Sequence, residues 1–260
     1  MGVFHEIVSI LGDGRLGPAL LGTGLTAARL FALFRTLPFL GGRRVPATLH
    51  LGLAAALGLA MGGGSALETV PPAPLAAALA VKEVVVGFSI GFLASLPFRF
   101  LEQSGILIDV TRSTQLSGSA GIGGNQSTPT GTFFLLMAMA VFFLTPAHRA
   151  FWMGVEASFL SVPLVPDGAL PYEPLAMTAI AASAGLFASS VMIAFPVLLS
   201  VLVTDLAIGA AGRFVPHSGG TFAFMPLRSV VGLGALALAL TVLAPTIARI
   251  LLESMRWLHL

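Results

Sequence analysis

Six long apolar runs dominate this sequence and limit the folds that are open to it. They lie near residues 16–40, 45–62, 74–98, 131–147, 174–211 and 227–252. A helix that crosses a bilayer needs roughly 20 apolar residues, so we expect six membrane spans, give or take one. The fifth run is too long for one straight span, and Pro196 inside it is expected to kink or split the helix.

The composition favours the same membrane location. Hydrophobic residues make up 56% of the 260 residues and charged residues only 9%, against roughly 25% charged in an ordinary soluble domain. The seventeen prolines and thirty glycines that punctuate the runs are typical of broken or re-entrant helices. We therefore expect an all-α, multi-helix membrane-associated protein of broken helical hairpins, folded as a single domain over residues 1–260.

Charge and cysteine content exclude several classes of function. The net charge of +2 comes from a few scattered arginines, so no basic face for nucleic acid is predicted. The absence of cysteine excludes disulfides, thiolate metal sites and cysteine nucleophiles. The five histidines are scattered and none lies in an HExxH pattern. We predict no enzyme activity, no cofactor and no metal site.

The third run contains two charged residues, Lys82 and Glu83, where a central charge costs about 3 kcal/mol on membrane-insertion scales. Adjacent helical residues point about 100° apart, so the two are not expected to neutralise each other. Glu83 shares one helical stripe with Gly87, Gly91 and Ser95. Small residues allow another helix to approach closely, while Glu83 hydrogen-bonds across the contact. The alternative is a proton or ion relay.

The fifth run repeats this pattern with Asp205, Gly209 and Arg213, spaced four apart. The carboxylate and the guanidinium lie on one side of the helix but two turns apart. Each is therefore expected to meet a different neighbour, again as an assembly contact.

The longest polar interval, from Arg99 to Thr130, is predicted to form a central loop at about 99–130. It contains SGSAGIGGNQSTPTG at 117–131, which is rich in glycine and serine and poor in large side chains. Such a segment either is a solvated connector or moves and threads a narrow space. Composition leaves both alternatives open.

Four segments, in order along the chain, resemble the type III secretion export-gate family. They are RTLPFLGGRRVP at 35–46, KEVVVGFSIGF at 82–92, GILID at 105–109 with QSTPTG at 126–131, and AFPVLLSVLVTDLAIGAAGRFVPHSGGTFAFMPLRS at 194–229. The family includes FliR of flagella and SctT, also called YscT, SpaR or HrcT, of injectisomes. The endings MPLRS and QSTPTG are more similar to the injectisome branch.

The resemblance implies a non-enzymatic subunit of a helical export-gate assembly in the bacterial inner membrane. Its implied partners are FliP/SctR-type and FliQ/SctS-type subunits, the FlhB/SctU-type switch protein, membrane lipid, and the unfolded secreted substrates that enter the pore. The rival interpretation is a small-solute secondary transporter that uses Glu83 or Asp205 for ion coupling.

Two sets of residues follow from the resemblance. A loop from about Ile108 to Gln126 is expected to help plug the closed pore, with plug residues Asp109, Arg112, Ser117, Gly121, Gly123, Gly124 and Gln126. The expected assembly contacts are Lys82, Glu83, Gly87, Gly91, Asp205, Gly209, Arg213, Pro216, Phe222, Pro226 and Arg228.

Overall fold

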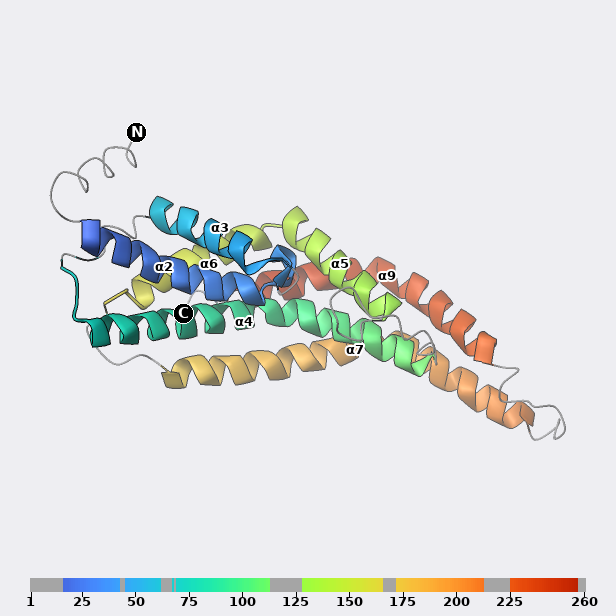
Figure 1. Ribbon diagram of the computed structural model, residues 1–260. Coiled ribbons are helices and arrows are strands. Elements are labelled where there is room, and N and C mark those ends of the chain that lie inside the picture. The colour runs from blue at the N-terminus through green and yellow to red at the C-terminus, as the bar shows by residue number, and fades with distance from the viewer. Residues whose placement is uncertain are drawn as a thin grey trace. The chain divides into compact units, whose positions relative to one another are not determined.

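The computed structural model describes residues 16–42, 45–61, 67, 69–112, 128–165, 172–212 and 225–256. Within these ranges the chain is entirely helical in its regular structure, which confirms the predicted all-α fold. The helices are α2 (Leu16–Thr36), η1 (Pro38–Leu40), α3 (Ala47–Ala60), α4 (Ala73–Thr111), α5 (Pro129–Leu144), α6 (Ala147–Ser161), α7 (Tyr172–Gly212) and α9 (Met225–Arg256), where η1 is a 3-10 helix (Figure 1).

The chain divides into two compact units. Unit 1 comprises Met1–Ser95, Phe151–Met177 and Arg256–Leu260, and unit 2 comprises Leu96–Ala150 and Thr178–Met255. The long helices α4 and α7 each contribute to both units.

Four of the described helices, namely α2, α4, α7 and α9, are long and apolar enough to cross a bilayer. The pair α5 and α6 passes the same test together but is bent by 77° at its break, which gives a fifth span if the pair is one broken span. The second run forms α3, whose 14 residues make about 21 Å of helix, too short for a hydrocarbon core of about 30 Å. The described residues thus hold four or five candidate spans, whereas the sequence predicted six, give or take one.

The predicted loop from Arg99 to Thr130 is helical at both of its ends. Helix α4 continues to Thr111, and α5 already begins at Pro129. The predicted loop started too early because buried apolar residues continue at helical spacing through this polar stretch, with Leu101 and Ile108 both almost fully buried.

Pro196 does not split α7, which runs without a break from Tyr172 to Gly212. The alternative that this proline splits the helix is therefore wrong. A proline removes one backbone hydrogen bond, a loss that apolar helices tolerate where neighbouring groups compensate. Pro196 leaves the carbonyl of Met192, four residues before it, without its helical N–H donor, and the helix continues through this position.

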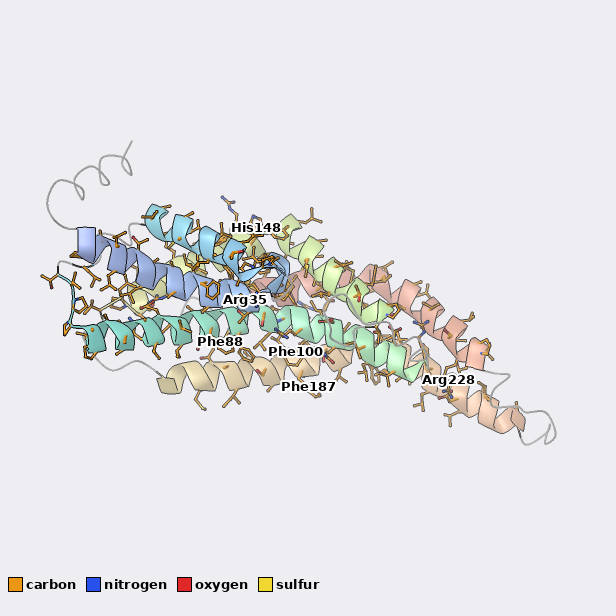
Figure 2. The ribbon with its side chains drawn as sticks, in the orientation of Figure 1. Arg35, Phe88, Phe100, His148, Phe187 and Arg228 are labelled. Atoms are coloured by element: carbon orange, nitrogen blue, oxygen red, sulfur yellow. The ribbon has the colours of Figure 1, made fainter. Side chains whose placement is uncertain are left out.

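In unit 1, helices α2 and α3 pack against each other around a tight turn (Figure 1). Gly41 and Gly42 have φ angles of 79° and 51°, the left-handed region that glycine adopts without strain. Arg35 Nη1 then donates to the carbonyls of Gly42 and Val45 at 3.0 and 3.1 Å. The arginine, which Figure 2 labels, thus holds the turn closed from inside.

The glycine stripe of α4 faces α2 of the same chain. A Cβ atom at Gly87 would overlap the backbone of Arg29, and one at Gly91 would lie 2.7 Å from the Leu33 carbonyl oxygen. Such distances are below any normal van der Waals contact, so only glycine fits at these two positions. The close helix approach that the stripe predicts is present, with α2 as the approaching helix.

In unit 2, the second part of α4 packs against α5. A Cβ atom at Gly105 would lie 2.6 Å from the Gly131 Cα atom, so the two helices meet backbone to backbone. The rings of Phe98 and Phe142 pack edge to face at 5.4 Å between centroids. Phe100 packs in the same manner on Phe187 of α7, at 6.4 Å (Figure 2).

The Gly87 contact gives a first prediction. Replacing Gly87 by Ala should lower the temperature at which the chain aggregates in membrane extracts, because overpacking costs about 1–3 kcal/mol. Gly24 on α2 is the control, since a Cβ atom there meets nothing within 4 Å. Gly24→Ala should leave the temperature unchanged or raise it, because Ala favours helix by about 1 kcal/mol over Gly. Equal temperatures for both variants would contradict the close packing.

Candidate functional site

The charged residues of α4 are buried in an ion cluster inside unit 1. Arg29 of α2, with no exposed side-chain surface, donates Nε and Nη2 to the two carboxylate oxygens of Glu83, the second at 3.0 Å. Lys82 Nζ lies 2.6 Å from Glu83 Oε1. The expectation that Lys82 and Glu83 do not pair is therefore wrong, because the long lysine side chain bends back to its neighbour.

The same two cations hold the end of α6. They donate to four backbone carbonyl oxygens in and after the last turn of α6, at 2.6 to 2.9 Å. These acceptors belong to Ser158, Val162, Pro163 and Leu164. The last carbonyls of a helix have no partner within the helix and carry partial negative charge, so cations stabilise them. The Phe159 ring lies 4.1 Å from Arg29 Cζ and adds a cation–π contact.

This cluster joins three helices of unit 1 through one carboxylate. Glu83 has no exposed surface and accepts from both cations, and the spare donors of Arg29 and Lys82 end on backbone oxygens. Buried charges are tolerated when they are paired and hydrogen-bonded in this manner. The contacts of Glu83 lie within one chain, and a contribution to subunit assembly stays a prediction.

A second polar cluster lies in unit 2, where the predicted plug residues Asp109 and Arg112 are found. Asp109, 2% exposed, accepts from the backbone nitrogen and the hydroxyl of Thr130 at 2.8 and 2.6 Å. Its carboxylate therefore caps the first turn of α5, where unpaired N–H groups favour an anion. Asp109 also accepts from Arg112 Nη1 at 3.2 Å.

Arg112 extends this cluster to α9. Its Nη2 donates to the Ser229 hydroxyl at 3.1 Å. A Cβ atom at Gly232 would lie 2.7 Å from Arg112 Cγ and Cδ, so the glycine makes room for the arginine stem. Next to Ser229, Arg228 pairs with Asp205 of α7, with 2.6 Å between Nη2 and Oδ1 (Figure 2). The sequence predicted different partners for Asp205 and Arg213. Arg228 is the partner of Asp205, and Arg213 lies outside the described residues.

The second cluster therefore connects α4, α5, α7 and α9 where they flank two segments, 113–127 and 213–224, that lie outside the described residues. Eight predicted site residues fall in these segments: Ser117, Gly121, Gly123, Gly124, Gln126, Arg213, Pro216 and Phe222. Of the remaining predicted contacts, Gly209 has open space around its Cα, and Pro226 is exposed in the first turn of α9.

Sequence reasoning missed Arg29, Thr130 and Ser229. Arg29 carried a usable signal, because it is an isolated charge in the first apolar run and calls for a partner as much as Glu83 does. Thr130 and Ser229 carried none, since serine and threonine in apolar helices commonly bond to their own backbone. Among the described residues, no group of three or more His, Asp or Glu side chains is placed to hold a metal ion.

Comparison with known proteins gives consistent matches. Residues 20–254 match the family described as bacterial export proteins, family 1. The chain is 30% identical to the flagellar biosynthetic protein FliR of Caulobacter vibrioides, over 85% of this chain and 88% of that protein. It is 25% identical to FliR of Escherichia coli, over 84% and 83%. It is 24% identical to the Yop proteins translocation protein T of Yersinia pestis, over 58% of each.

These matches bear on the predicted branch. The flagellar relatives match over more of the chain, and with equal or higher identity, than the Yersinia protein does. The preference for the injectisome branch, which rested on the MPLRS and QSTPTG segments, is therefore not confirmed.

The buried ion cluster of unit 1 gives a second prediction. Glu83→Gln should destabilise the chain by about 3–5 kcal/mol, because it leaves two buried cations without a counter-charge. The control is Glu156→Gln, an exposed site on α6, expected within about 0.5 kcal/mol of the parent. Thermal aggregation and protease resistance in membranes measure the effect. A Glu83→Gln chain that is as stable as its parent and assembles, but fails in export, would favour the ionic relay instead.

Proposed function

We propose a specific place in protein export for this chain, which belongs to the bacterial export proteins, family 1. Its relatives include flagellar FliR and the Yop translocation protein T, and the chain is accordingly a non-enzymatic, multi-pass inner-membrane subunit of a type III protein export apparatus. Within that apparatus, it forms part of the export gate together with FliP/SctR-type and FliQ/SctS-type subunits. It also contacts the FlhB/SctU-type switch protein.

The observation that carries the gate proposal is the exposure of the hairpin formed by α7 and α9. The apolar windows of α7 and α9 are only 33% and 22% buried, against 61% for α2 and 56% for α4. Large side chains stand exposed along both helices, among them Phe195, Leu202, Leu206, Val230 and Leu233. Contiguous exposed apolar side chains mark contacts with another protein or with the membrane. The outer face of this hairpin is where sister subunits pack.

The second cluster supports a role for the central loop in closing the pore. Asp109 and Arg112 fix the end of α4 to α5 and to α9, so the loop that follows Arg112 starts from a rigid base. Its small residues lower the steric cost of filling a narrow passage, and ordering them costs more backbone entropy than in an average loop. The loop from 113 to 126 therefore plugs the closed pore and leaves it when an unfolded substrate arrives.

A secondary transporter is the rival function, and the contacts of its coupling residues argue against it. Ion coupling needs a carboxylate that can reach water or substrate. Glu83 has no exposed surface and is held by two cations. Asp205 is partly exposed but is paired with Arg228.

A third prediction follows from the exposed hairpin. Expressed alone, the chain should be scarce and short-lived, and co-expression with the FliP/SctR-type subunit should raise its level severalfold, because unpartnered apolar helix faces expose the chain to aggregation and proteolysis. Pulse-chase labelling of the tagged chain measures its half-life, and an unrelated membrane protein co-expressed at the same level is the control. Abundant, monodisperse chain without partners would contradict the proposal. The co-purifying set, flagellar or injectisome, identifies the branch.

A fourth prediction concerns the plug. Deleting the seven residues from Ser117 to Gly123 should leave assembly intact and make the membrane permeable to small solutes. Ion conductance and dye uptake, compared between the wild-type and shortened complexes at matched assembly levels, measure the leak. A simple connector predicts no leak, so unchanged permeability would remove the plug assignment and leave the family assignment standing.

A further inference from the structure

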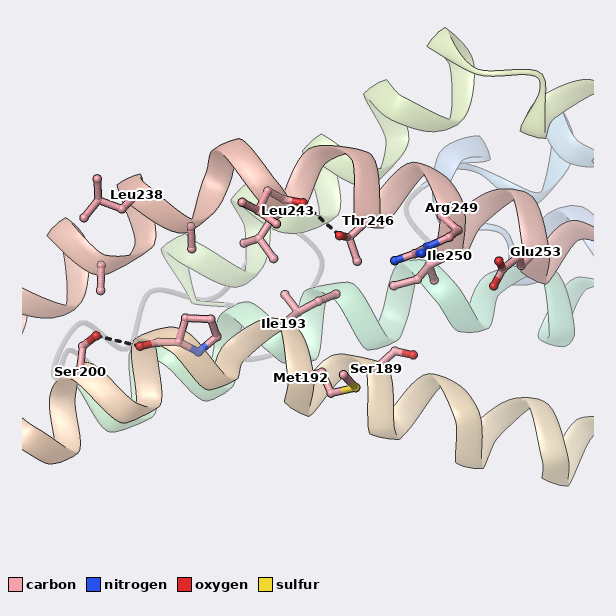
Figure 3. Close-up of a pocket in the computed structure, with 14 residues that line it drawn as sticks. Ser189, Met192, Ile193, Ser200, Leu238, Leu243, Thr246, Arg249, Ile250 and Glu253 are labelled. Atoms are coloured by element: carbon pink, nitrogen blue, oxygen red, sulfur yellow. Dashed lines mark hydrogen bonds between the residues drawn. The ribbon is translucent and has the colours of Figure 1, made fainter.

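Each helix of the hairpin formed by α7 and α9 contains a proline in its interior, Pro196 and Pro245. A proline leaves the carbonyl four residues before it without its helical donor, and helix bends commonly occur there. At Pro196, the Ser200 hydroxyl donates to the proline carbonyl at 2.8 Å (Figure 3). Beside Pro245, the Thr246 hydroxyl donates to the Val242 carbonyl at 3.0 Å (Figure 3). Hydroxyls that bond back along their own helix in this way favour bending.

The two helices leave each other room to bend, because an open groove lies between them around the prolines. The groove has a volume of about 880 Å³ (Figure 3). Pro196 and Ser200 line it on α7, and Val242 and Thr246 line it on α9. In a close-packed core, interdigitated side chains would resist such a movement. Within this chain, bending of one helix at its proline is therefore not blocked by the other.

Beyond the two prolines lies the hairpin tip, which we define as residues 197–212 of α7 and 225–244 of α9. Its packing is loose, since Leu206 and Val230 are 67% and 66% exposed. By contrast, Leu251, on the other side of the α9 proline, is fully buried. Segments with few buried contacts open at a lower free energy than a packed core does. The tip can therefore swing while the end of α9 stays in place.

The two helices of the tip are joined to each other and held against α4. Asp205 and Arg228 pair across the tip, with 2.6 Å between Oδ1 and Nη2, so its two helices move together. Arg112 of α4 packs its stem on Gly232 and donates Nη2 to the Ser229 hydroxyl at 3.1 Å.

The contact between Arg112 and α9 is easily released. Arg112 Nε is buried and has no hydrogen-bond partner among the described residues. Leaving a buried donor unpaired costs a free energy of the same order as one hydrogen bond contributes. Water that reaches Nε when the tip moves away therefore offsets the loss of the bond to Ser229, while Nη1 keeps its bond to Asp109.

The contact between α4 and α5 is more resistant. Asp109 accepts two hydrogen bonds from Thr130, at 2.8 and 2.6 Å. Gly105 and Gly131 bring the two helix backbones into direct contact beside this pair. Separating the helices would break both bonds and leave the first turn of α5 without its cap. We therefore expect α4 and α5 to stay together when the tip is released.

We propose that Arg112, Ser229 and Gly232 form a latch that holds the hairpin tip against α4 and releases it when the chain opens. In the open state, α7 and α9 bend at Pro196 and Pro245 and the tip moves away, while α4 and α5 remain joined. This inference rests on the proposed function for its consequence, which is that an export substrate passes only after the latch is released.

A first test measures the latch by distances and needs no export. The chain has no cysteine, so pairs of spin labels can be attached at exposed positions in a complex whose other subunits lack reactive cysteine. Val110→Cys with Val230→Cys reports the distance between α4 and α9, and Val110→Cys with Phe133→Cys reports that between α4 and α5.

In this test, Ser229→Ala should shift the α4–α9 distances to longer and broader values, because it removes the acceptor of Arg112 Nη2. The α4–α5 distances should not change. Ser183→Ala is the matched control, since this α7 hydroxyl bonds only to its own helix among the described residues. Identical α4–α9 distances in Ser229→Ala and the parent chain would overturn the latch.

A second test locks each contact with a disulfide. A Cβ atom at Gly232 lies 2.7 Å from Arg112 Cγ, and one at Gly131 lies 2.8 Å from Ile106 Cγ1. The Sγ atom of an introduced cysteine takes the place of that γ carbon, and a disulfide places Cβ roughly 3 Å from the partner Sγ. Arg112→Cys with Gly232→Cys therefore joins α4 to α9, and Ile106→Cys with Gly131→Cys, the matched control, joins α4 to α5.

Export by each double variant is compared between its oxidised and reduced forms at matched assembly levels. The α4–α9 disulfide should abolish export and reductant should restore it, whereas the α4–α5 disulfide should leave export unchanged. Export that continues through the α4–α9 disulfide, or that stops equally with both, would overturn the latch. Export that persists after deletion of the whole chain would instead contradict the proposed function, and the spin-label distances would still decide the latch.

Discussion

A carboxylate buried among apolar helices must be matched by cations, and the matching of Glu83 organises unit 1. Arg29, separated from Glu83 by 54 residues in sequence, supplies a two-point contact, and its Nη1 donates to the carbonyl of Ser158, which is 129 residues from Arg29. The gain from such a buried pair over an apolar core is small, but the loss on breaking it is large. The cluster therefore fixes which helices are neighbours more than it adds stability.

In unit 2, buried charges are likewise paired, here at the ends of helices. Asp109 satisfies N–H and hydroxyl groups at the start of α5, and Arg112 carries the connection to the start of α9. Polar groups are concentrated where helices begin and end because the helix interiors already satisfy their own backbone. The cost of burying these charges is therefore offset at the ends of the helices that they connect.

Most helices could be predicted from the apolar runs of the sequence, but most contacts between helices could not. The helical spans of α2, α5, α7 and α9 follow the apolar runs closely, and the Gly87 and Gly91 stripe marks a close contact. Spacing along one helix identifies a face, but it contains no information about which helix meets that face. The pairing of Glu83 with Arg29 and that of Arg112 with Ser229 could not be predicted for this reason. The split at Pro196 was expected because a proline removes one helical hydrogen bond, but α7 continues through it, as apolar helices often do.

The charged residues of this chain fall into two groups, according to whether their partners lie inside the chain. Arg29, Lys82, Glu83 and Asp109 are buried and find their partners inside the chain. Arg249 and Glu253 are exposed on α9, the least buried of the four long apolar helices. Exposed charges on an apolar helix are stabilised by contact with water, lipid headgroups or another subunit. The hairpin of α7 and α9 therefore holds both kinds of charge: Asp205 pairs with Arg228 within the chain, whereas Arg249 and Glu253 are exposed to its surroundings.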